Sequence, residues 1–377
     1  MRQTGPRTRT RILYVIDYAL STGGAERFAV GLATHLPQDR FEPWVCSTRN
    51  SDPGAEAALA AAGVPHLSLG RVAKWDVYKF AGLVRILRRQ RFDVLHSHMF
   101  GSNLWGSVIG TACRVPVIVA QEHSWSFEGN PLRTWVDGNV IGRLVDRFVA
   151  VSRADAERMV AREGVRADKV EVIPNGYIPS PANSITDVRA ELGLDHAVPV
   201  IAIAAVLRPE KRLELLLEAH AEVLRALPAT QLLLAGDGPC RQELEDTAHD
   251  LGLDGHVHFL GHRRDVDSVL RAANVAALSS DREGSPLLMF ECMANSTPLV
   301  ATAVGGVPDV IDDGRTGVLV PRRDPGAMAQ ALIGILTDPE RAGQLAAAAR
   351  EDLDRFTIDA TAARYASLYD RLLSIER

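Results

Sequence analysis

The sequence predicts an α/β protein made of two Rossmann-like, doubly wound domains, and three observations lead to this. The chain has 377 residues, and at roughly 150 residues per domain this length favours two cores over one. Short β-branched runs alternate with amphipathic helical patterns in both halves, as in parallel sheets covered by helices. Between the halves, residues 173–197 interrupt the alternation with several Pro and Asn residues, as an interdomain linker does.

The first half supplies the strands and helices of one such domain. Its strand candidates are nearly continuous in apolar residues, as expected for strands buried on both faces. They are residues 11–17, 41–47, 64–69, 93–96, 117–121 and 147–151, with amphipathic helices at 25–36 and 76–89 between them. We expect an N-terminal domain of residues 1–180.

The second half repeats the alternation after the linker. Strands are predicted at residues 200–207, 231–235, 257–260, 275–279, 298–301 and 317–320, and helices at 213–227, 241–251, 266–273 and 286–294. We expect a C-terminal domain of residues 181–358. Because ligands of open α/β sheets bind at the carboxyl ends of the strands, two facing domains predict a central cleft.

The composition excludes several classes of protein. Hydrophobic residues make up 46% and charged residues 24%, which is unlike disordered, collagen-like or coiled-coil chains. The four cysteines lie far apart without a C-x-x-C pair, so neither a disulfide framework nor a zinc site is indicated. The longest apolar run, residues 198–207, has half the roughly 20 residues that cross a bilayer. We expect a cytoplasmic protein.

Charge is unevenly distributed between the halves. Residues 1–180 contain 23 Lys and Arg against 17 Asp and Glu, a net charge of +6, and the remainder contains 19 against 30, a net charge of −11. The basic half suggests an anionic partner such as a phosphate or a membrane surface, and ordinary surface variation is the alternative. The basic helix around Arg85, Arg88, Arg89 and Arg91 is a candidate for peripheral contact with the inner membrane face, or an ordinary solvated face.

Two short motifs suggest an anionic ligand. Gly23 and Gly24 follow the first strand and open a helix, where backbone N–H groups bind anions, although a Gly-Gly turn is also a common structural feature. After the strand 200–207 comes the segment Arg208-Pro-Glu-Lys211-Arg212. Three cations at a strand end suit a diphosphate, and a helix start with solvated cations is the alternative.

The most informative motif places two carboxylates eight residues apart. Glu283 falls in a loop, and Glu291 falls about a turn and a half into the helix expected from Pro286. Pro286 suits the first helical position, and the helix N-terminus offers N–H groups to a phosphate. Since carboxylates bind neighbouring sugar hydroxyls, both groups are expected to border one ligand. A purely structural helix leaves Glu291 unexplained among apolar neighbours.

The motif Glu283-x7-Glu291, with Gly284, Pro286 and Met293-Ala294, resembles the E-x7-E motif of retaining glycosyltransferases of family 4, which have the GT-B fold. Other segments agree along residues 11–332. They are Gly23-Gly24-Ala25-Glu26, Val151-Ser152, Val172-Ile173-Pro174-Asn175-Gly176, Leu234-Ala235-Gly236-Asp237-Gly238-Pro239, Phe259-Leu260-Gly261 and Val304-Gly305-Gly306-Val307-Pro308-Asp309.

The resemblance implies a role for each matching position. Glu291 would bind the ribose and Glu283 the donor sugar, while Lys211, helped by Arg208, would neutralise the leaving diphosphate. The remaining implied positions are Gly24 at the phosphate and acceptor side, His123 facing the donor sugar, the backbone of Gly284, Ser285, Pro286, Leu287 and Leu288 at the sugar and phosphate, and the backbone of His262 and Arg263 at the base. In this family the last helix, here about 359–377, often packs back on the first domain.

The sequence departs from the family pattern at two places. An Arg usually stands five residues before the Lys, where this chain has Val206, so Arg208 or Arg212 would have to supply the guanidinium. The segment Tyr177-Ile178-Pro179 replaces a frequent Val-Asp pair.

Two motifs that imitate metal sites are interpreted without metal. Asp265-Val-Asp267 opens a helix, where Asp265 is expected to act as N-cap. His96-Ser-His98 spans the expected end of a strand at His96, lacks an acidic third ligand and is assigned to the wall of the cleft. We expect neither a metal ion nor another cofactor.

We therefore predict a retaining glycosyltransferase that uses a nucleotide-diphosphate sugar, with a UDP-sugar favoured and a GDP-sugar as the alternative. The acceptor is expected to be a saccharide or lipid-linked, in cell-surface polysaccharide or glycoconjugate synthesis, and no nucleic acid is expected. Two other functions stay open: a nucleotide-sugar epimerase of similar fold, and a catalytically inactive donor-binding partner.

Overall fold

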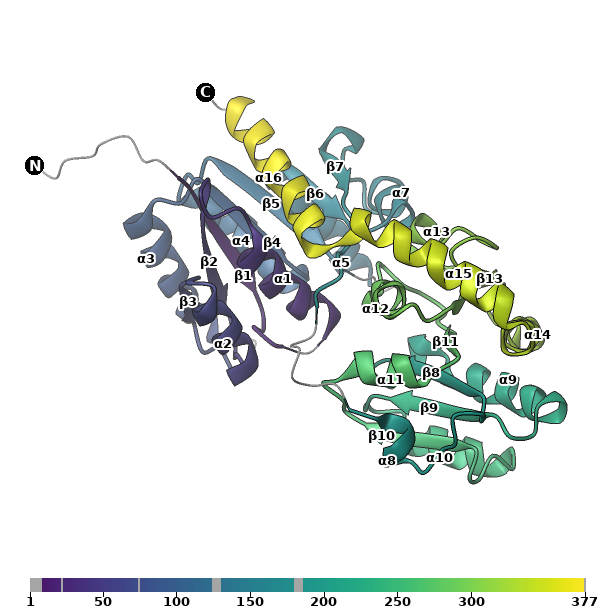
Figure 1. Cartoon of the computed structure of the whole chain (residues 1–377). Coiled ribbons are helices and arrows are strands. Elements are labelled where there is room, and N and C mark those ends of the chain that lie inside the picture. The colour runs from purple at the N-terminus through teal and green to yellow at the C-terminus, as the bar shows by residue number, and fades with distance from the viewer. Residues whose placement is uncertain (1–8, 22, 74, 124–129, 180–185, 376–377) are drawn as a thin grey trace, which may run out of the picture. The chain divides into compact units, whose positions relative to one another are not determined.

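The computed structural model describes residues 9–21, 23–73, 75–123, 130–179 and 186–375. The chain divides into two compact units, one of Met1–Ile178 with Thr357–Arg377 and one of Pro179–Phe356. Each contains one parallel β-sheet with helices on its faces (Figure 1). The predicted class, α/β with two doubly wound domains, is confirmed. The division after residue 178 lies close to the expected boundary at 180.

Unit 1 is built on a seven-stranded sheet of order β3-β2-β1-β4-β5-β6-β7. Its strands are β1 Thr10–Ile16, β2 Phe41–Ser47, β3 His66–Ser68, β4 Val94–His98, β5 Val117–Glu122, β6 Arg147–Ala150 and β7 Val170–Val172. Its α-helices are α1 Gly24–His35, α2 Pro53–Ala61, α3 Ala81–Gln90, α4 Phe100–Ala112, α5 Pro131–Val136, α6 Gly142–Leu144, α7 Arg153–Ala161 and α16 Ile358–Ile375. Shorter turns are η1 Asp76–Phe80, the π-helical η2 Asp137–Ile141 and η3 Ala167–Lys169.

Unit 2 contains a six-stranded sheet of order β10-β9-β8-β11-β12-β13. Its strands are β8 Val200–Ala204, β9 Gln231–Ala235, β10 Val257–Gly261, β11 Val275–Leu278, β12 Leu299–Thr302 and β13 Val318–Val320. Its helices are α8 Val188–Glu191, η5 Pro209–Lys211, α9 Leu213–Ala226, α10 Arg241–Asp250, α11 Val266–Ala272, α12 Leu287–Asn295, α13 Val307–Val310, α14 Pro325–Thr337, α15 Pro339–Asp352 and η6 Leu353–Phe356.

The central strands are buried on both faces because helices cover each side of the sheet. In β1, Ile12 and Tyr14 join the apolar cluster under α1 and α16, whereas Leu13 and Val15 join the cluster under α3, α4 and α7. Successive side chains of a strand point to opposite faces, so this alternation with complete burial is what a central parallel strand requires.

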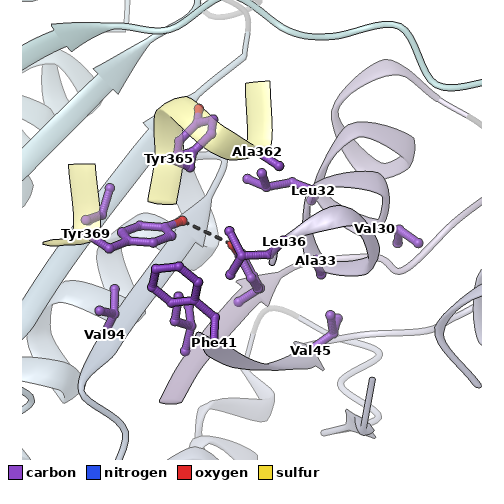
Figure 2. Packing of buried hydrophobic residues seen from close by; sticks show 14 of the residues in the cluster. Val30, Leu32, Ala33, Leu36, Phe41, Val45, Val94, Ala362, Tyr365 and Tyr369 are labelled. Atoms are coloured by element: carbon purple, nitrogen blue, oxygen red, sulfur yellow. Dashed lines mark hydrogen bonds between the residues drawn. The ribbon is translucent and has the colours of Figure 1, made fainter. Parts of the chain in front are cut away.

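The C-terminal helix α16 completes the first of these clusters. Figure 2 shows Tyr369 over Phe41 of β2 and beside Leu36, the residue that follows α1, and Tyr365 on the side of Leu32 of α1. The Tyr369 hydroxyl lies 3.1 Å from that of Tyr14, which is fully buried. The last helix therefore packs on unit 1, as the resemblance implied for residues 359–377.

Several element boundaries differ from the prediction; strand β8, for example, ends at Ala204 and not at residue 207. Three differences have a clear structural reason. Strand β4 continues to His98 instead of ending at His96, because it pairs with β5 as far as Gln121. The expected linker 173–197 contains α8, whose Arg189 donates to the backbone of Asp195, Val198 and Ala272. Pro286 has extended backbone (φ −66°, ψ 130°) and precedes α12, so the proline stands at the N-cap instead of the first helical position.

Candidate functional site

Two loops meet at the carboxyl end of the unit 2 sheet. One follows β8 and the other follows β11, and these strands are neighbours in the sheet. The Asp281 amide donates to the Glu210 carbonyl at 2.9 Å, and the Ser279 hydroxyl donates to the Lys211 carbonyl at 2.9 Å. The two loops are thus fixed to one another by hydrogen bonds that do not depend on a ligand.

Within these loops, Lys211 and Glu283 form an ion pair. The Lys211 Nζ lies 2.7 Å from the Glu283 Oε1, and the Ser280 hydroxyl donates to the same oxygen at 2.5 Å. The side chain of Glu283 is 7% exposed and that of Lys211 is 21% exposed. A mostly buried carboxylate beside a more accessible ammonium is suited to bind hydroxyls and an anionic group of one ligand.

Glu291 lies in α12, the helix that follows this loop. Glu291 is buried, and so is Ser285, which lies two residues before the helix begins. The first N–H groups of an α-helix have no acceptor inside the helix, so the residues at the start of α12 present donors to an anion. Glu283 and Ser285 therefore lie in the loop that connects β11 to α12, and Glu291 lies in the helix itself, as the spacing predicted.

The loop that carries Glu283 is held from behind by two glycines. The Gly306 amide donates to the Gly284 carbonyl at 3.0 Å. Gly305 has φ +54°, and a Cβ at this position would lie 1.6 Å from the Glu283 carbonyl oxygen. Only glycine allows this approach. In the sequence, Gly305 and Gly306 contributed only to the family resemblance, and this supporting role was not predicted.

Arg208 and Arg212, the two candidates to replace the arginine that this family usually has at the position of Val206, differ in their surroundings. Arg212 is engaged by Glu214 at 2.8 Å and by Asp281 at 3.5 Å. The side chain of Arg208 is 57% exposed, and its ion-pair partner, Glu210, lies 4.0 Å away. Arg208 is thus the guanidinium that remains accessible to an anionic ligand near Val206, which is itself exposed.

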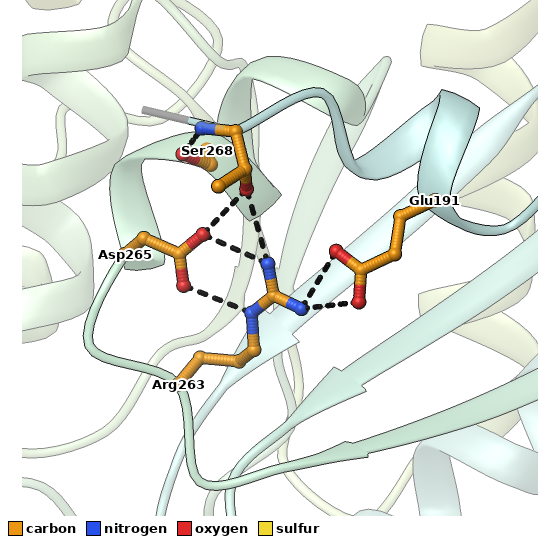
Figure 3. A network of polar contacts seen from close by, with 5 residues as sticks. Glu191, Arg263, Asp265 and Ser268 are labelled. Atoms are coloured by element: carbon orange, nitrogen blue, oxygen red, sulfur yellow. Dashed lines mark hydrogen bonds and ion pairs between the residues drawn. The ribbon is translucent and has the colours of Figure 1, made fainter. Parts of the chain in front are cut away.

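Arg263 is engaged by protein groups (Figure 3). Its guanidinium donates to both carboxylate oxygens of Glu191 and to both of Asp265. These hydrogen bonds raise its pKa. The side chain therefore fixes the loop after β10, whose backbone, with exposed His262, was expected to receive the base.

The N-cap role expected of Asp265 is wrong in its detail. The residue precedes α11, but its side chain makes no capping hydrogen bond. It accepts instead from Arg263 and from the Thr186 hydroxyl. The strong bidentate pair with Arg263 explains why this carboxylate is turned away from the helix N-terminus.

In unit 1 the two glycines after β1 have different environments. Gly23 has φ +87° and stands at the N-cap of α1, which begins at Gly24. A Cβ on Gly24 would meet no atom within 4 Å. The described neighbours therefore do not require glycine at position 24, and an anion-binding role for Gly24 stays a prediction.

His123 ends the described part of the segment after β5 and is buried against histidine and phenylalanine rings. Its Nε2 lies 3.0 Å from the Nδ1 of His98, and Phe28 of α1 packs edge-on at 5.5 Å between ring centroids. Burial lowers the pKa of His123 to about 3. His123 is therefore neutral at physiological pH, when it can donate or accept a hydrogen bond but carries no charge.

A larger buried polar network surrounds this histidine, and the sequence analysis missed it. His96 lies 2.8 Å from the Tyr369 hydroxyl, and the Tyr365 hydroxyl donates to Gln121 at 2.8 Å. The rings of His96 and His98 have centroids 4.3 Å apart and are tilted by 33°, and His98 stacks on His123 at 5.3 Å. The aromatic spacing of Tyr365 and Tyr369 indicates a buried helix face, but nothing in sequence shows that this face covers a histidine pair.

Two absences concern the described residues only. Among them, no group of three or more His, Cys, Asp or Glu side chains is arranged to hold a metal ion. None of their helices combines the length and apolar character needed to traverse a bilayer.

The fold matches solved structures along nearly the whole chain. An Anabaena protein, Alr3699/HepE, crystallised with UDP-glucose, superposes with a TM-score of 0.83 at 22% identity over 96% of this chain and 100% of that one. WaaG, described as a glycosyltransferase involved in lipopolysaccharide biosynthesis, superposes with a TM-score of 0.72 at 16% identity over 95% and 99%. Two parallel-sheet units of this kind make up the GT-B fold.

The sequence comparisons then give the family. Residues 22–180 match the family described as Glycosyltransferase Family 4, and residues 184–352 match Glycosyl transferases group 1. A D-inositol 3-phosphate glycosyltransferase from Xylanimonas cellulosilytica is 33% identical over 360 residues, 89% of this chain and 80% of the relative. One from Kineococcus radiotolerans is 30% identical over 93% and 90%. The chain belongs to the family 4, group 1 glycosyltransferases.

Proposed function

We propose that this glycosyltransferase transfers a sugar from a nucleotide-diphosphate donor with retention of the anomeric configuration and without a metal ion. Glu291 binds the ribose and Glu283 binds hydroxyls of the donor sugar. The backbone from Gly284 to Leu288 contacts the sugar and phosphate, and the loop at His262 and Arg263 receives the base.

The observation that carries this proposal is the Lys211–Glu283 pair at 2.7 Å, on the loop that leads to Glu291. In the structure, Glu283 compensates the Lys211 charge. A bound diphosphate offers Lys211 a stronger anionic partner, and Glu283 is then available to the sugar hydroxyls. The pair thereby links recognition of the phosphate to recognition of the sugar.

Chemically, departure of the diphosphate leaves an oxocarbenium-like carbon and a growing negative charge. Lys211, Arg208 and the first amides of α12 stabilise that charge. Glu283 is assigned to sugar binding, and among the described residues we assign no covalent nucleophile. We therefore propose that the acceptor attacks from the face that the diphosphate leaves, with the phosphate taking up the acceptor proton.

The similar structures support a donor class, and the name of the relatives suggests one acceptor to test. A UDP-sugar is favoured, since the similar Anabaena structures were solved with UDP and with UDP-glucose. The relatives' name introduces D-inositol 3-phosphate as an acceptor to test beside saccharide and lipid-linked acceptors. We propose cytoplasmic transfer on the route to a cell-surface polysaccharide or glycoconjugate, with peripheral contact at the inner membrane face.

The first experiment is a calorimetric binding panel of UDP, GDP, ADP and their sugar conjugates, with and without magnesium. Specific binding to one nucleotide, indifferent to magnesium, is expected. Glu283→Gln should weaken binding of the nucleotide sugar more than that of the free nucleotide, whereas Glu291→Gln should weaken both. Full donor affinity and turnover in both variants would disprove these assignments.

Product analysis separates the remaining functions. A transferase releases nucleotide only in proportion to an acceptor, and NMR of the product should show the anomeric configuration of the donor. An epimerase converts the donor alone into a new nucleotide sugar. A donor-binding partner binds the nucleotide but gives no acceptor-dependent turnover.

A further inference from the structure

The positive charge of the N-terminal half is concentrated in one short segment. Residues 71–91 contain seven Lys and Arg and a single acid, Asp76, a net charge of +6. This equals the net charge of residues 1–180 as a whole, so the other residues of that half balance one another. The Asp76 carboxylate accepts hydrogen bonds from the backbone amides of Val72 and Ala73, so it is engaged within its own turn.

The same segment exposes large apolar side chains. Val72 is 76% exposed, Trp75 79%, Val77 46% and Tyr78 69%. Single exposed apolar residues are ordinary, but four within seven positions are typical of an interaction surface. Trp and Tyr in particular concentrate where an apolar phase meets water.

Helix α3 continues this surface with arginines. Leu83 and Leu87 are buried in the core of unit 1, and Val84 and Ile86 pack against that core. Arg85, Arg88 and Arg89 are exposed on the opposite face, and no ion pair joins them to the described residues. At helical spacing, positions 78, 81, 85 and 88 follow one side of η1 and α3, so the aromatic and basic residues share a face.

The peripheral membrane contact in the proposed function has no defined surface, and we propose that it is made by this basic-aromatic face, which binds a bilayer that contains anionic lipid. The face consists of Val72, Trp75, Val77, Tyr78, Arg85, Arg88 and Arg89. Charge complementarity favours this partner, since unpaired arginines attract anionic headgroups while Trp75 and Tyr78 enter the interface. Because the apolar side of α3 lies in the protein core, the helix is not inserted into lipid. Contact is made by the arginines and by the exposed turn before them.

The experiment is co-sedimentation of the full chain with phosphatidylcholine vesicles that contain or lack phosphatidylglycerol. Binding should require phosphatidylglycerol and should be lost in molar salt, where the Debye length is about 3 Å. The variant R85Q/R88Q/R89Q should bind about 100-fold more weakly, since each basic residue contributes roughly fivefold. The variant W75S/Y78S should also bind more weakly and should lose the blue shift of tryptophan emission on adding vesicles.

Matched controls are available in the same unit. R114Q/R143Q/R166Q removes three other exposed arginines, and L132S/W135S removes another exposed apolar pair. Both should bind vesicles like the unchanged chain. Equal loss in the controls, binding without anionic lipid, no vesicle binding, or preference for RNA or for a second copy of the chain would each overturn the proposal. None of these results depends on donor binding or turnover, so they leave the proposed transferase function separately testable.

Discussion

Units 1 and 2 share a sheet topology, but the ionisable groups at the carboxyl ends of their strands differ in burial and in charge. The order β10-β9-β8-β11-β12-β13 repeats β3-β2-β1-β4-β5-β6, and unit 1 adds β7 at one edge. In unit 2 the groups near the strand ends are charged and paired. In unit 1, His98 at the end of β4 and His123 just after β5 are buried and neutral, although Glu122 of β5 pairs with the buried Arg133 at 3.1 Å. The same backbone therefore supports two different kinds of chemistry.

The ion pairs of unit 2 keep its carboxylates charged. The pKa of Asp281 is lowered, first by its hydrogen bond from Arg323 and then by the charge of Arg212. The pKa of Asp265 is lowered by its hydrogen bonds from Arg263. Such a region keeps its charges across the physiological range and can recognise a charged ligand.

Burial has the opposite effect in unit 1. It lowers the pKa of His96 to about 3 and, with the charges of Asp137 and Glu122, raises that of Glu163 to about 9. Asp137 is raised to about 6. His96 and Glu163 are therefore neutral at pH 7, whereas Asp137, which lies 3.6 Å from Arg133, is mostly ionised at that pH. The topology of a parallel sheet therefore does not decide whether its carboxyl end carries charge. The side chains packed over that end decide it.

The largest effect should come from the charged end of unit 2. Lys211→Ala should lower transfer by about 100- to 1,000-fold, because the leaving diphosphate loses a preorganised cation. Lys211→Arg should retain part of the activity, and Arg225→Gln, at an exposed position of α9, should retain all of it. Steady-state rates with saturating donor measure the effect. Full activity in Lys211→Ala would remove the chemical role from this pair.

The substitution Glu163→Gln, which preserves the shape of the side chain, tests whether Glu163 of unit 1 is buried in its neutral form. With a folded pKa of about 9 and an unfolded value near 4.5, Glu163 keeps a proton that the unfolded chain has lost. The free energy of unfolding should therefore fall as pH rises from 4.5 to 9, by up to about 1.4 kcal/mol per pH unit.

Glu163→Gln cannot titrate, so its stability relative to the unchanged chain should improve steadily with pH. Denaturant unfolding between pH 5 and 8 measures the slope, with Glu157→Gln on the exposed side of α7 as the control. If the two variants and the unchanged chain have parallel slopes, Glu163 is not buried in its neutral form.

The support behind Glu283 is tested by Gly305→Ala. The new Cβ would meet the Glu283 carbonyl at 1.6 Å in a backbone of φ +54°. We expect a loss of about 1–3 kcal/mol of stability and weaker donor binding. Gly334→Ala in α14, where a Cβ meets nothing within 4 Å, should cost no stability. Unchanged stability and donor affinity in Gly305→Ala would contradict this support.

The smallest effect concerns the departure at Val206. Arg208→Gln should weaken nucleoside diphosphate binding about tenfold, the effect of one charge-assisted hydrogen bond. Adding Val206→Arg in this background should restore the affinity, which calorimetry would measure. If Arg208→Gln binds the nucleoside diphosphate normally, Lys211 and the α12 amides are sufficient to bind the diphosphate. Arg208 then does not replace the arginine that the family usually has at position 206.

Much of the fold could be predicted from the sequence, because parallel strands and the helices that cover them have strong apolar patterns. The β9 strand was predicted with its observed bounds, and α9 differs by one residue at its end. Strands β8 and β3 are shorter than predicted. Two other errors lie where tertiary contacts decide the end of an element: pairing with β5 extends β4 to His98, and the loop before α12 leaves Pro286 extended. Neither effect is encoded in the local pattern.

By itself, the sequence determined the fold class, the order of strands and helices, and the shared connection of Glu283 and Glu291, since local periodicity and spacing specify them. Only the tertiary structure decided which charges are already paired: Lys211 with Glu283, Arg212 with Asp281, and Arg263 with two carboxylates. It also decided that α16 covers the histidines of unit 1. Ion pairs and burial join residues up to hundreds of positions apart, so no local pattern contains them.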